Sequence, residues 1–179
     1  LDYPDFLVLD LDPSKKNTFD EVIETALQVN EVLKSIKIEG YCKTSGSTGI
    51  HVYIPMGGKY DFDQVKDFAH ILMKQVNEQL PKITTLERSL QKRDDKKIYL
   101  DYLQNRTGQT LASAYSLRPK QGASVSMPLE WNELKPGLKP TDFNIYNALD
   151  RIKEKGDLFK PVLGKGIDMM KALELLQRE

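Results

Sequence analysis

The sequence predicts an α+β domain in which helices flank a mixed or largely antiparallel sheet. Strand-length apolar runs and helix-length amphipathic stretches follow one another as strand, helix, two strands, helix, two strands and then short helices. This order lacks the regular strand–helix–strand alternation of a parallel sheet, so neighbouring strands are expected to run mainly antiparallel. With 179 residues, the chain is long enough to bury such a core within one domain.

The first strand and the first helix have clear local signals. Residues Phe6–Asp12 read FLVLDLD, an apolar run that passes into alternation, and Pro13 ends this strand because proline cannot donate to the ladder. Thr18 and Glu21 have the spacing of a capping box. We therefore expect a helix from this point to about Lys34.

The next elements surround a glycine-rich turn. One strand is expected over Ile36–Lys43, and another over His51–Pro55 after the turn. Apolar residues then recur at helical spacing over Asp61–Leu80, a helix that Pro81 stops. The polar and basic stretch Ile83–Lys97 is expected to be irregular.

The C-terminal half is less regular. Two more strands are expected, Ile98–Leu103 and Leu111–Leu117, joined by a turn over residues 104–109. Beyond them the chain is rich in proline and glycine as far as Pro140. Two or three short helices are expected to follow, at about Phe143–Lys155, Leu158–Val162 and Ile167–Gln177.

Composition limits the classes of function. The 26 basic and 26 acidic side chains cancel, which argues against binding of nucleic acid by bulk charge but not against a local basic groove. Lys92, Arg93 and Lys97 are candidate nucleic-acid contacts, although such a cluster is more often a solvated face. The single cysteine, Cys42, excludes an internal disulfide and is typical of an intracellular protein. No apolar run approaches the roughly 20 residues of a membrane span.

Three aspartates are candidate metal ligands. Asp10 and Asp12 are two positions apart on one expected strand, so their side chains leave the same face about 6.5 Å apart. Asp101 lies in a second apolar strand, IYLDYL, where a carboxylate is costly unless paired. Such a set suits two Mn²⁺ or Mg²⁺ ions in phosphoryl transfer. The alternative is that these acids cap helices or lie in solvent at strand ends.

The turn between the second and third strands is a candidate phosphate-binding loop. It reads TSGSTGIH, in which glycines permit positive φ and close approach of a phosphate, and successive amides can form an anion nest. A strand follows and no Gly-Lys-Ser/Thr is present, so this is not a Walker loop. A hairpin loop with a satisfied histidine remains the alternative. The candidate nucleotide-binding residues here are Ser45, Gly46, Thr48, Gly49 and His51.

Arg118 follows the last expected strand and precedes Pro119. Its planar guanidinium suits a triphosphate. A solvated arginine at the end of a strand is the alternative explanation.

Three motifs in order resemble the polymerase domain of bacterial ATP-dependent DNA ligase D, a member of the archaeo-eukaryotic primase superfamily. These motifs are LDYPDFLVLDLDP, KTSGSTGIHVYIP and YLDYLQNRTGQTLASAYSLRP. The resemblance covers nearly the whole chain. It implies a primase-type catalytic core that uses manganese or magnesium to extend DNA ends and fill gaps in non-homologous end joining, with ribonucleotides preferred.

The resemblance also implies residue roles and partners. Asp10 and Asp12 would be paired metal ligands, and Asp101 the third acid. Ser45 and His51 would contact the incoming nucleotide, Arg118 its phosphates, and Gln104 the primer or nucleotide. The implied partners are DNA ends or gapped DNA, nucleoside triphosphates, the Ku end-binding protein and a ligase domain, in the bacterial cytoplasm at the nucleoid.

Two departures and two alternatives accompany this resemblance. Thr48 stands where the family often has lysine or arginine. The family's segment before the first acid motif is missing, so residues 1–179 are expected to be a fragment of the catalytic core. A haloacid-dehalogenase-like phosphatase also has an Asp-x-Asp after an apolar strand, with its first aspartate as a nucleophile. A non-catalytic module that binds DNA ends is the third hypothesis.

Overall fold

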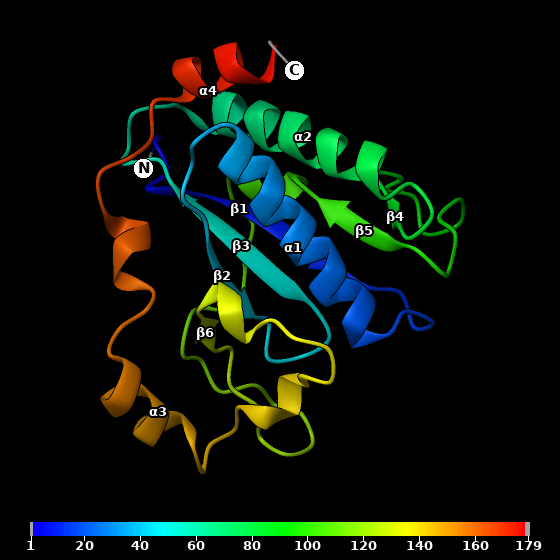
Figure 1. The fold of residues 1–179 in the computed structure, drawn as a ribbon, viewed down its shortest axis with the longest axis vertical. Helices are drawn as coiled ribbons and strands as arrows, with labels where there is room; N and C mark the ends of the chain where they lie inside the picture. Colours follow the sequence, from blue (N-terminus) through cyan, green and yellow to red (C-terminus); the bar gives the residue numbers. More distant parts are fainter. Residues whose placement is uncertain (1, 178–179) are drawn as a thin grey trace.

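The computed structural model describes residues 2–177, which form a six-stranded sheet in the order β4-β5-β1-β3-β2-β6 (Figure 1). The strands are β1 Phe6–Asp12, β2 Tyr41–Thr44, β3 Ile50–Pro55, β4 Thr84–Thr85, β5 Ile98–Asp101 and β6 Pro128–Leu129. Neighbouring strands are antiparallel except for β4 and β5, which are parallel. The sheet is therefore mixed and largely antiparallel, and the α+β prediction is confirmed.

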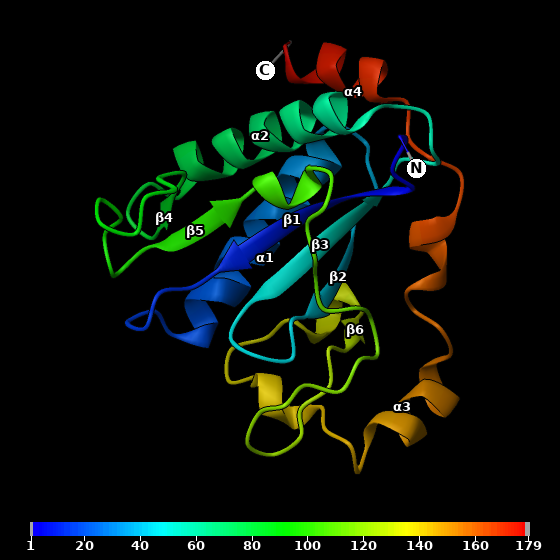
Figure 2. The same cartoon turned by 180° about the vertical axis from the view of Figure 1, so that it is seen from behind.

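Two long helices cover one face of this sheet, lying side by side across it (Figures 1 and 2). The helices are α1 Phe19–Ser35, α2 Phe62–Gln79, α3 Ala148–Lys155 and α4 Met169–Leu176, with short 3-10 turns η1 Leu103–Asn105, η2 Trp131–Glu133, η3 Pro140–Asp142 and η4 Lys160–Leu163. The expected capping box of Thr18 and Glu21 forms at the start of α1, and a second one forms at the start of α2. Local sequence signals therefore set the starts of both helices.

The alternation of side chains along β1 decides which face of the sheet holds the two aspartates. Leu7, Leu9 and Leu11 are fully buried and belong to the main core, which includes the apolar stripes of α1 and α2. Because successive side chains leave opposite faces of a strand, Asp10 and Asp12 lie on the other face, which we call the open face. The core thus fixes β1 in the register that presents both carboxylates away from the helices.

The second strand is shorter than the sequence predicts and begins at Tyr41. Lys37 has a φ of 59°, and the Ile38 amide donates to the Leu33 carbonyl at 2.8 Å, which closes the end of α1. The side chains of Ile36 and Ile38 are buried in the core. The apolar residues that suggested a strand here instead pack the end of the helix into the core.

The predicted strand Leu111–Leu117 is wrong. Among the described residues this segment has one isolated bridge, between Leu117 and Val125, and Tyr115 has a φ of 62°, which a strand does not accommodate. The segment passes over the open face of the sheet (Figure 2). Its apolar and polar residues alternate as in a strand, but the segment does not join the six-stranded sheet.

The strand predicted over Ile98–Leu103 ends two residues early, at Asp101. There the Asp101 carboxylate accepts a hydrogen bond from the Leu103 amide at 2.8 Å, and the chain turns into η1. The stretch from Ile83 to Lys97 is irregular as predicted, apart from the two-residue strand β4.

Candidate active site

The three aspartates come from adjacent strands and share the open face. In the antiparallel register, Asp10 of β1 lies directly opposite Asp101 of β5, and Asp12 lies opposite Tyr99. Burial, together with the charges of Asp12 and Asp101, raises the pKa of Asp10 to about 7 against the opposing charge of Lys43. The carboxylates therefore lie near enough to repel one another, as the sequence predicts.

Asp101 and Asp12 are held by neighbouring groups on or near their own strands. Asp101 accepts hydrogen bonds from the Leu103 amide and, at 3.3 Å, from Gln104 Nε2. Asp12 lies 3.8 Å from the guanidinium of Arg93. Within residues 2–177, no three His, Cys, Asp or Glu side chains are close enough to form a ready-made metal site. The predicted placement of the acids is present, but their convergence on a common point is not.

The basic cluster near residue 93 is partly built into the fold. The Arg93 guanidinium stacks 3.9 Å from the Tyr99 ring centroid and donates to the carbonyls of Glu87 and Arg88. Lys97 Nζ donates to the Pro81 carbonyl just after α2, whereas Lys92 is exposed. Arg93 and Lys97 therefore have structural roles, and contact of this cluster with nucleic acid stays a prediction.

The glycine turn is compact because of Ser45. Its hydroxyl accepts hydrogen bonds from the amides of Ser47 at 3.1 Å and Gly49 at 3.0 Å. A Cβ on Gly49 would lie 2.4 Å from the Leu11 carbonyl oxygen, and Gly46 has a φ of +68° with the Arg118 side chain against it. Both glycines are thus required by close packing. Two of the amides that a phosphate nest would use already bind Ser45.

His51 joins the turn to the carboxylates. Its Nε2 lies 3.4 Å from an Asp10 oxygen, and its buried Nδ1 has no hydrogen-bond partner among the described residues. Burial, together with the charges of Lys43 and Arg118, lowers the pKa of His51 to about 2. The imidazole is therefore neutral, and one of its nitrogens is free to bind a group that enters the site.

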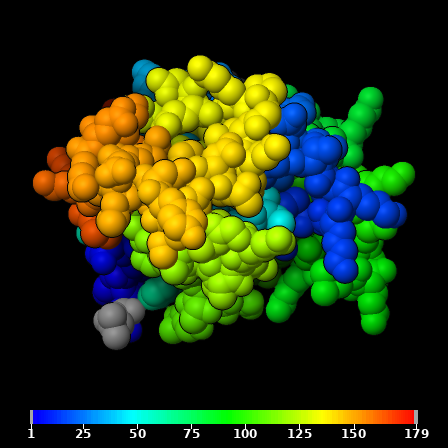
Figure 3. Space-filling view, turned by 90° about the horizontal axis from the view of Figure 1, so that it is seen from below, coloured from blue at the N-terminus to red at the C-terminus, as the bar shows by residue number. Residues whose placement is uncertain are grey.

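A cleft of about 270 Å³ lies over the open face and brings most of the predicted residues together. Its predicted lining residues are Asp10, Asp12, Ser45, Thr48, Gly49, His51, Gln104 and Arg118. Asp101 and Gly46 do not line it. Arg118 Nη1 donates to the Ser45 carbonyl at 3.3 Å, which holds the guanidinium against the turn. In the space-filling view from below, the chain after η1 forms most of this end of the molecule (Figure 3).

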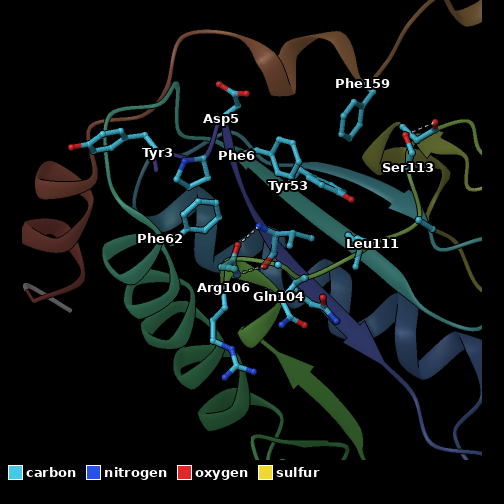
Figure 4. A pocket seen from close by; sticks show the side chains of 17 residues that line it. Tyr3, Asp5, Phe6, Tyr53, Phe62, Gln104, Arg106, Leu111, Ser113 and Phe159 are labelled. Atoms are coloured by element: carbon cyan, nitrogen blue, oxygen red, sulfur yellow. Dashed lines mark hydrogen bonds between the residues drawn. The ribbon is translucent and has the colours of Figure 1, made fainter. Parts of the chain in front are cut away.

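A second cavity of about 480 Å³ adjoins the cleft, and the two share Gln104, Leu111 and Ala112. Its walls include Phe6, Tyr53 and other aromatic side chains near the start of β1 (Figure 4). The sequence does not predict this cavity, because its walls come from distant segments.

The sequence also missed Lys43, which is fully buried on the open face beside His51. Its position two residues after Tyr41 on a strand was the available signal, because that spacing places both side chains on one face. The register was needed to show which face that is.

Comparisons with known proteins identify the family of this chain. A family model described as LigD, primase-polymerase domain, matches residues 1–159. The chain is 34% identical over 154 residues to the bifunctional non-homologous end joining protein LigD of Bacillus subtilis (strain 168), covering 86% of this chain and 25% of that protein. It is 32% identical over 157 residues to the multifunctional non-homologous end joining protein LigD of Mycolicibacterium smegmatis, covering 87% of this chain and 20% of that protein.

A solved structure has the same fold. The polymerase domain from Mycobacterium tuberculosis ligase D in complex with DNA is similar with a TM-score of 0.82 and 27% identity, over 92% of this chain and 57% of that chain. The chain thus spans a quarter or less of the two curated relatives. Within residues 2–177, no helix combines the length and apolar character that a membrane span needs. The chain belongs to the LigD primase-polymerase domain family, whose members are DNA-directed nucleotidyltransferases, and not to the phosphatases.

Proposed function

We propose that this chain adds nucleotides, with ribonucleotides preferred, to the 3′ ends and gaps of DNA in non-homologous end joining. The observation that carries the proposal is the placement of Asp10, Asp12 and Asp101 on one face of adjacent strands, beside a cleft lined by His51 and Arg118. The relatives' names state non-homologous end joining, and the solved neighbour is bound to DNA. Ku and a ligase domain are the proposed protein partners.

The carboxylates fit Mn²⁺ or Mg²⁺ in ligand type. Carboxylate oxygens are hard ligands that these cations accept, and burial with the charges of Asp12 and Asp101 disfavours the ionised form of Asp10, which a bound cation would relieve. Asp12 and Asp101 would turn from Arg93 and Gln104 to serve as ligands. When bound, such cations stabilise charge on the phosphoryl group and lower the pKa of an attacking hydroxyl.

The remaining cleft residues supply contacts for a nucleoside triphosphate. Arg118 offers a guanidinium for its phosphates, and Thr48 is exposed at the tip of the turn. His51 Nδ1 and Gln104 Oε1 are buried polar atoms without partners in the described structure. Buried polar atoms are normally paired, so these two are the proposed acceptors for hydroxyl or water donors that accompany the nucleotide.

Primer extension tests this proposal. A gapped DNA substrate with Mn²⁺ and ribonucleotides is extended by the wild-type chain, while Asp12→Ala is expected to lose activity by at least about a hundredfold. Thermal unfolding of the variant is expected to be unchanged or higher, since one of three repelling charges is removed. Equal incorporation by both proteins, or no incorporation by the wild type, would contradict the proposal.

A further inference from the structure

Lys43 extends the row of polar side chains that crosses the open face. Lys43 of β2 lies opposite His51 of β3. His51 in turn lies opposite Asp10 of β1, which lies opposite Asp101 of β5. The row therefore places a cation two strands from the Asp10 carboxylate, directly before the glycine turn.

The ammonium of Lys43 is buried with little compensation. None of the residue is exposed, and Nζ donates to Ser126 Oγ at 2.5 Å. Nζ also lies 5.8 Å from the Tyr53 ring centroid. Within residues 2–177, no carboxylate oxygen lies within 4.0 Å of Lys43 Nζ. Burial lowers the pKa of Lys43 to about 7, opposed by the charge of Asp10 and assisted by that of Arg118.

Such an arrangement costs stability. A buried charge destabilises a fold unless ion pairs and hydrogen bonds compensate it, and an apolar residue of similar volume often serves the fold as well or better. In place of an ion pair, Lys43 has one hydrogen bond, to the neutral hydroxyl of Ser126. The packing of the chain alone therefore does not account for a cation at this position.

The surroundings of Lys43 indicate where its charge acts. Ser126 Oγ, which accepts from Lys43, donates to the Thr44 carbonyl at 2.9 Å and so joins the ammonium to the turn. The fields of Lys43 and Arg118 both act on His51. A positive charge under the turn and a guanidinium beside it both favour an anion in the cleft between them.

We propose that Lys43 is a positioning residue for the phosphates of the nucleotide, acting as a buried positive charge beneath His51 and the glycine turn without touching the substrate. This inference rests on the proposed function, because it concerns nucleotide binding at the same cleft. It assigns a part of the phosphate attraction to a side chain that lies beneath the site rather than in it.

Lys43→Met separates this role from a structural one. Methionine has a similar length and no charge, so thermal stability is expected to be unchanged or higher. The Kd for fluorescently labelled ATP with Mn²⁺, measured by anisotropy, is expected to rise roughly tenfold, the effect of about 1.4 kcal/mol. The rise for labelled AMP is expected to be smaller, since the effect depends on phosphate charge.

Ser126→Ala is the matched control. It removes the hydrogen-bond acceptor but keeps the ammonium, so it is expected to lower stability with less effect on the Kd for ATP than Lys43→Met. Lys43→Gln serves as a second uncharged variant if methionine prevents folding. Parallel losses of stability and affinity in both Lys43→Met and Ser126→Ala would show a structural tether and overturn the inference.

The wild-type measurement distinguishes the two proposals. Wild-type protein that binds labelled ATP, with Lys43→Met and Lys43→Gln binding it equally well, overturns the role of Lys43 and leaves the proposed function standing. Wild-type protein that binds no ATP contradicts the proposed function and this inference with it.

Discussion

At the scale of single residues, the site depends on very close backbone packing beside its charges. Leu11, which lies between Asp10 and Asp12, is fully buried, and its carbonyl faces Gly49. A glycine is needed there because any Cβ would meet a backbone atom that β1 and β3 hold in register. The same contact that closes the turn therefore also fixes the strand that carries the carboxylates.

Gly49→Ala tests this packing. The added Cβ would lie 2.4 Å from the Leu11 carbonyl oxygen, so the variant is expected to lose about 1–3 kcal/mol of stability. Nucleotide incorporation is expected to fall as well, because β1 has to shift. Urea unfolding and primer extension measure the two effects. Thr48→Ala, at an exposed position of the same turn, is expected to change stability by less than about 0.5 kcal/mol. Equal stability of Gly49→Ala and wild type would refute the packing argument.

At the scale of elements, the side chain of Asn105 supplies hydrogen bonds to one edge of β1. Beyond Asp101, β5 no longer pairs with β1, and Asn105 takes its place. Its Oδ1 accepts from the Val8 amide at 2.8 Å, and its Nδ2 donates to the Val8 carbonyl at 2.7 Å and to the Tyr102 carbonyl at 2.9 Å. Asn105 thus pairs the backbone groups of Val8 in β1, although the chain leaves the sheet at Asp101.

Asn105→Ala is expected to destabilise the fold by about 2–4 kcal/mol, since two buried backbone groups of Val8 lose their partners. Asn105→Asp should also be destabilising, because a carboxylate cannot donate to the Val8 carbonyl. The midpoint of urea unfolding measures both. Gln109→Ala, at an exposed position nearby, is the control. If Asn105→Ala lost less stability than Gln109→Ala, water would be replacing the hydrogen bonds of the Asn105 side chain and the prediction would be wrong.

A second element-scale contact joins α3 to η2. Arg151 makes two hydrogen bonds with Glu133, at 2.7 and 2.6 Å, and its guanidinium lies 4.9 Å from the Phe143 ring centroid. Burial raises the pKa of Glu133, but the hydrogen bonds and charge of Arg151 outweigh it and hold that pKa below its ordinary value of 4.5. The pair therefore favours the ionised glutamate.

This shift determines a pH dependence. Because the folded pKa of Glu133 is depressed, its stabilisation is fully present above the unfolded value and is lost as the pH falls through the folded one. Glu133→Gln is expected to cost about 1–2 kcal/mol at neutral pH, with a difference from wild type that shrinks below pH 4.5. Urea titrations across this range measure it. Asp150→Asn, in an exposed pair with Lys153, should change stability little. A constant difference at all pH values would contradict the ionic origin.

At the scale of the whole molecule, one face of the sheet packs the apolar core and the other holds the candidate active site. The face under α1 and α2 holds most of the apolar core, while the open face holds the acids, His51 and Lys43. The net charge of zero means that no overall field draws DNA to the protein, so attraction of DNA has to come from local basic groups such as the exposed Lys92.

The salt dependence of DNA binding tests this view. A plot of log K against log salt for gapped DNA is expected to have a slope shallower than about −4, since fewer than about five phosphates are neutralised. Lys92→Ala is expected to reduce the slope by about 1 if this exposed side chain contacts a DNA phosphate. Fluorescence titrations at several salt concentrations measure both. A steeper wild-type slope would indicate a basic surface that the cleft does not contain.

Prediction from sequence succeeded where periodicity is local and failed where a partner strand decides. The pattern of β1 and the caps of α1 and α2 lie within short windows, and the structure confirms them. Leu111–Leu117 alternates like a strand but forms only an isolated bridge, between Leu117 and Val125, within the described residues. The two-residue strands β4 and β6 are too short to leave a pattern. Lys43 was missed because a lysine on a strand is ordinarily assigned to solvent.

The sequence by itself determined the class of fold, the two long helices and the common face of Asp10 and Asp12, because helix and strand periods fix which side chains share a face. Tertiary structure alone decided that Asp101 lies opposite Asp10, that Lys43 is buried beside His51, and that the segment after η1 covers the open face. These are contacts between residues far apart in the chain. They depend on strand register, which the packing of the whole core sets and no local pattern encodes.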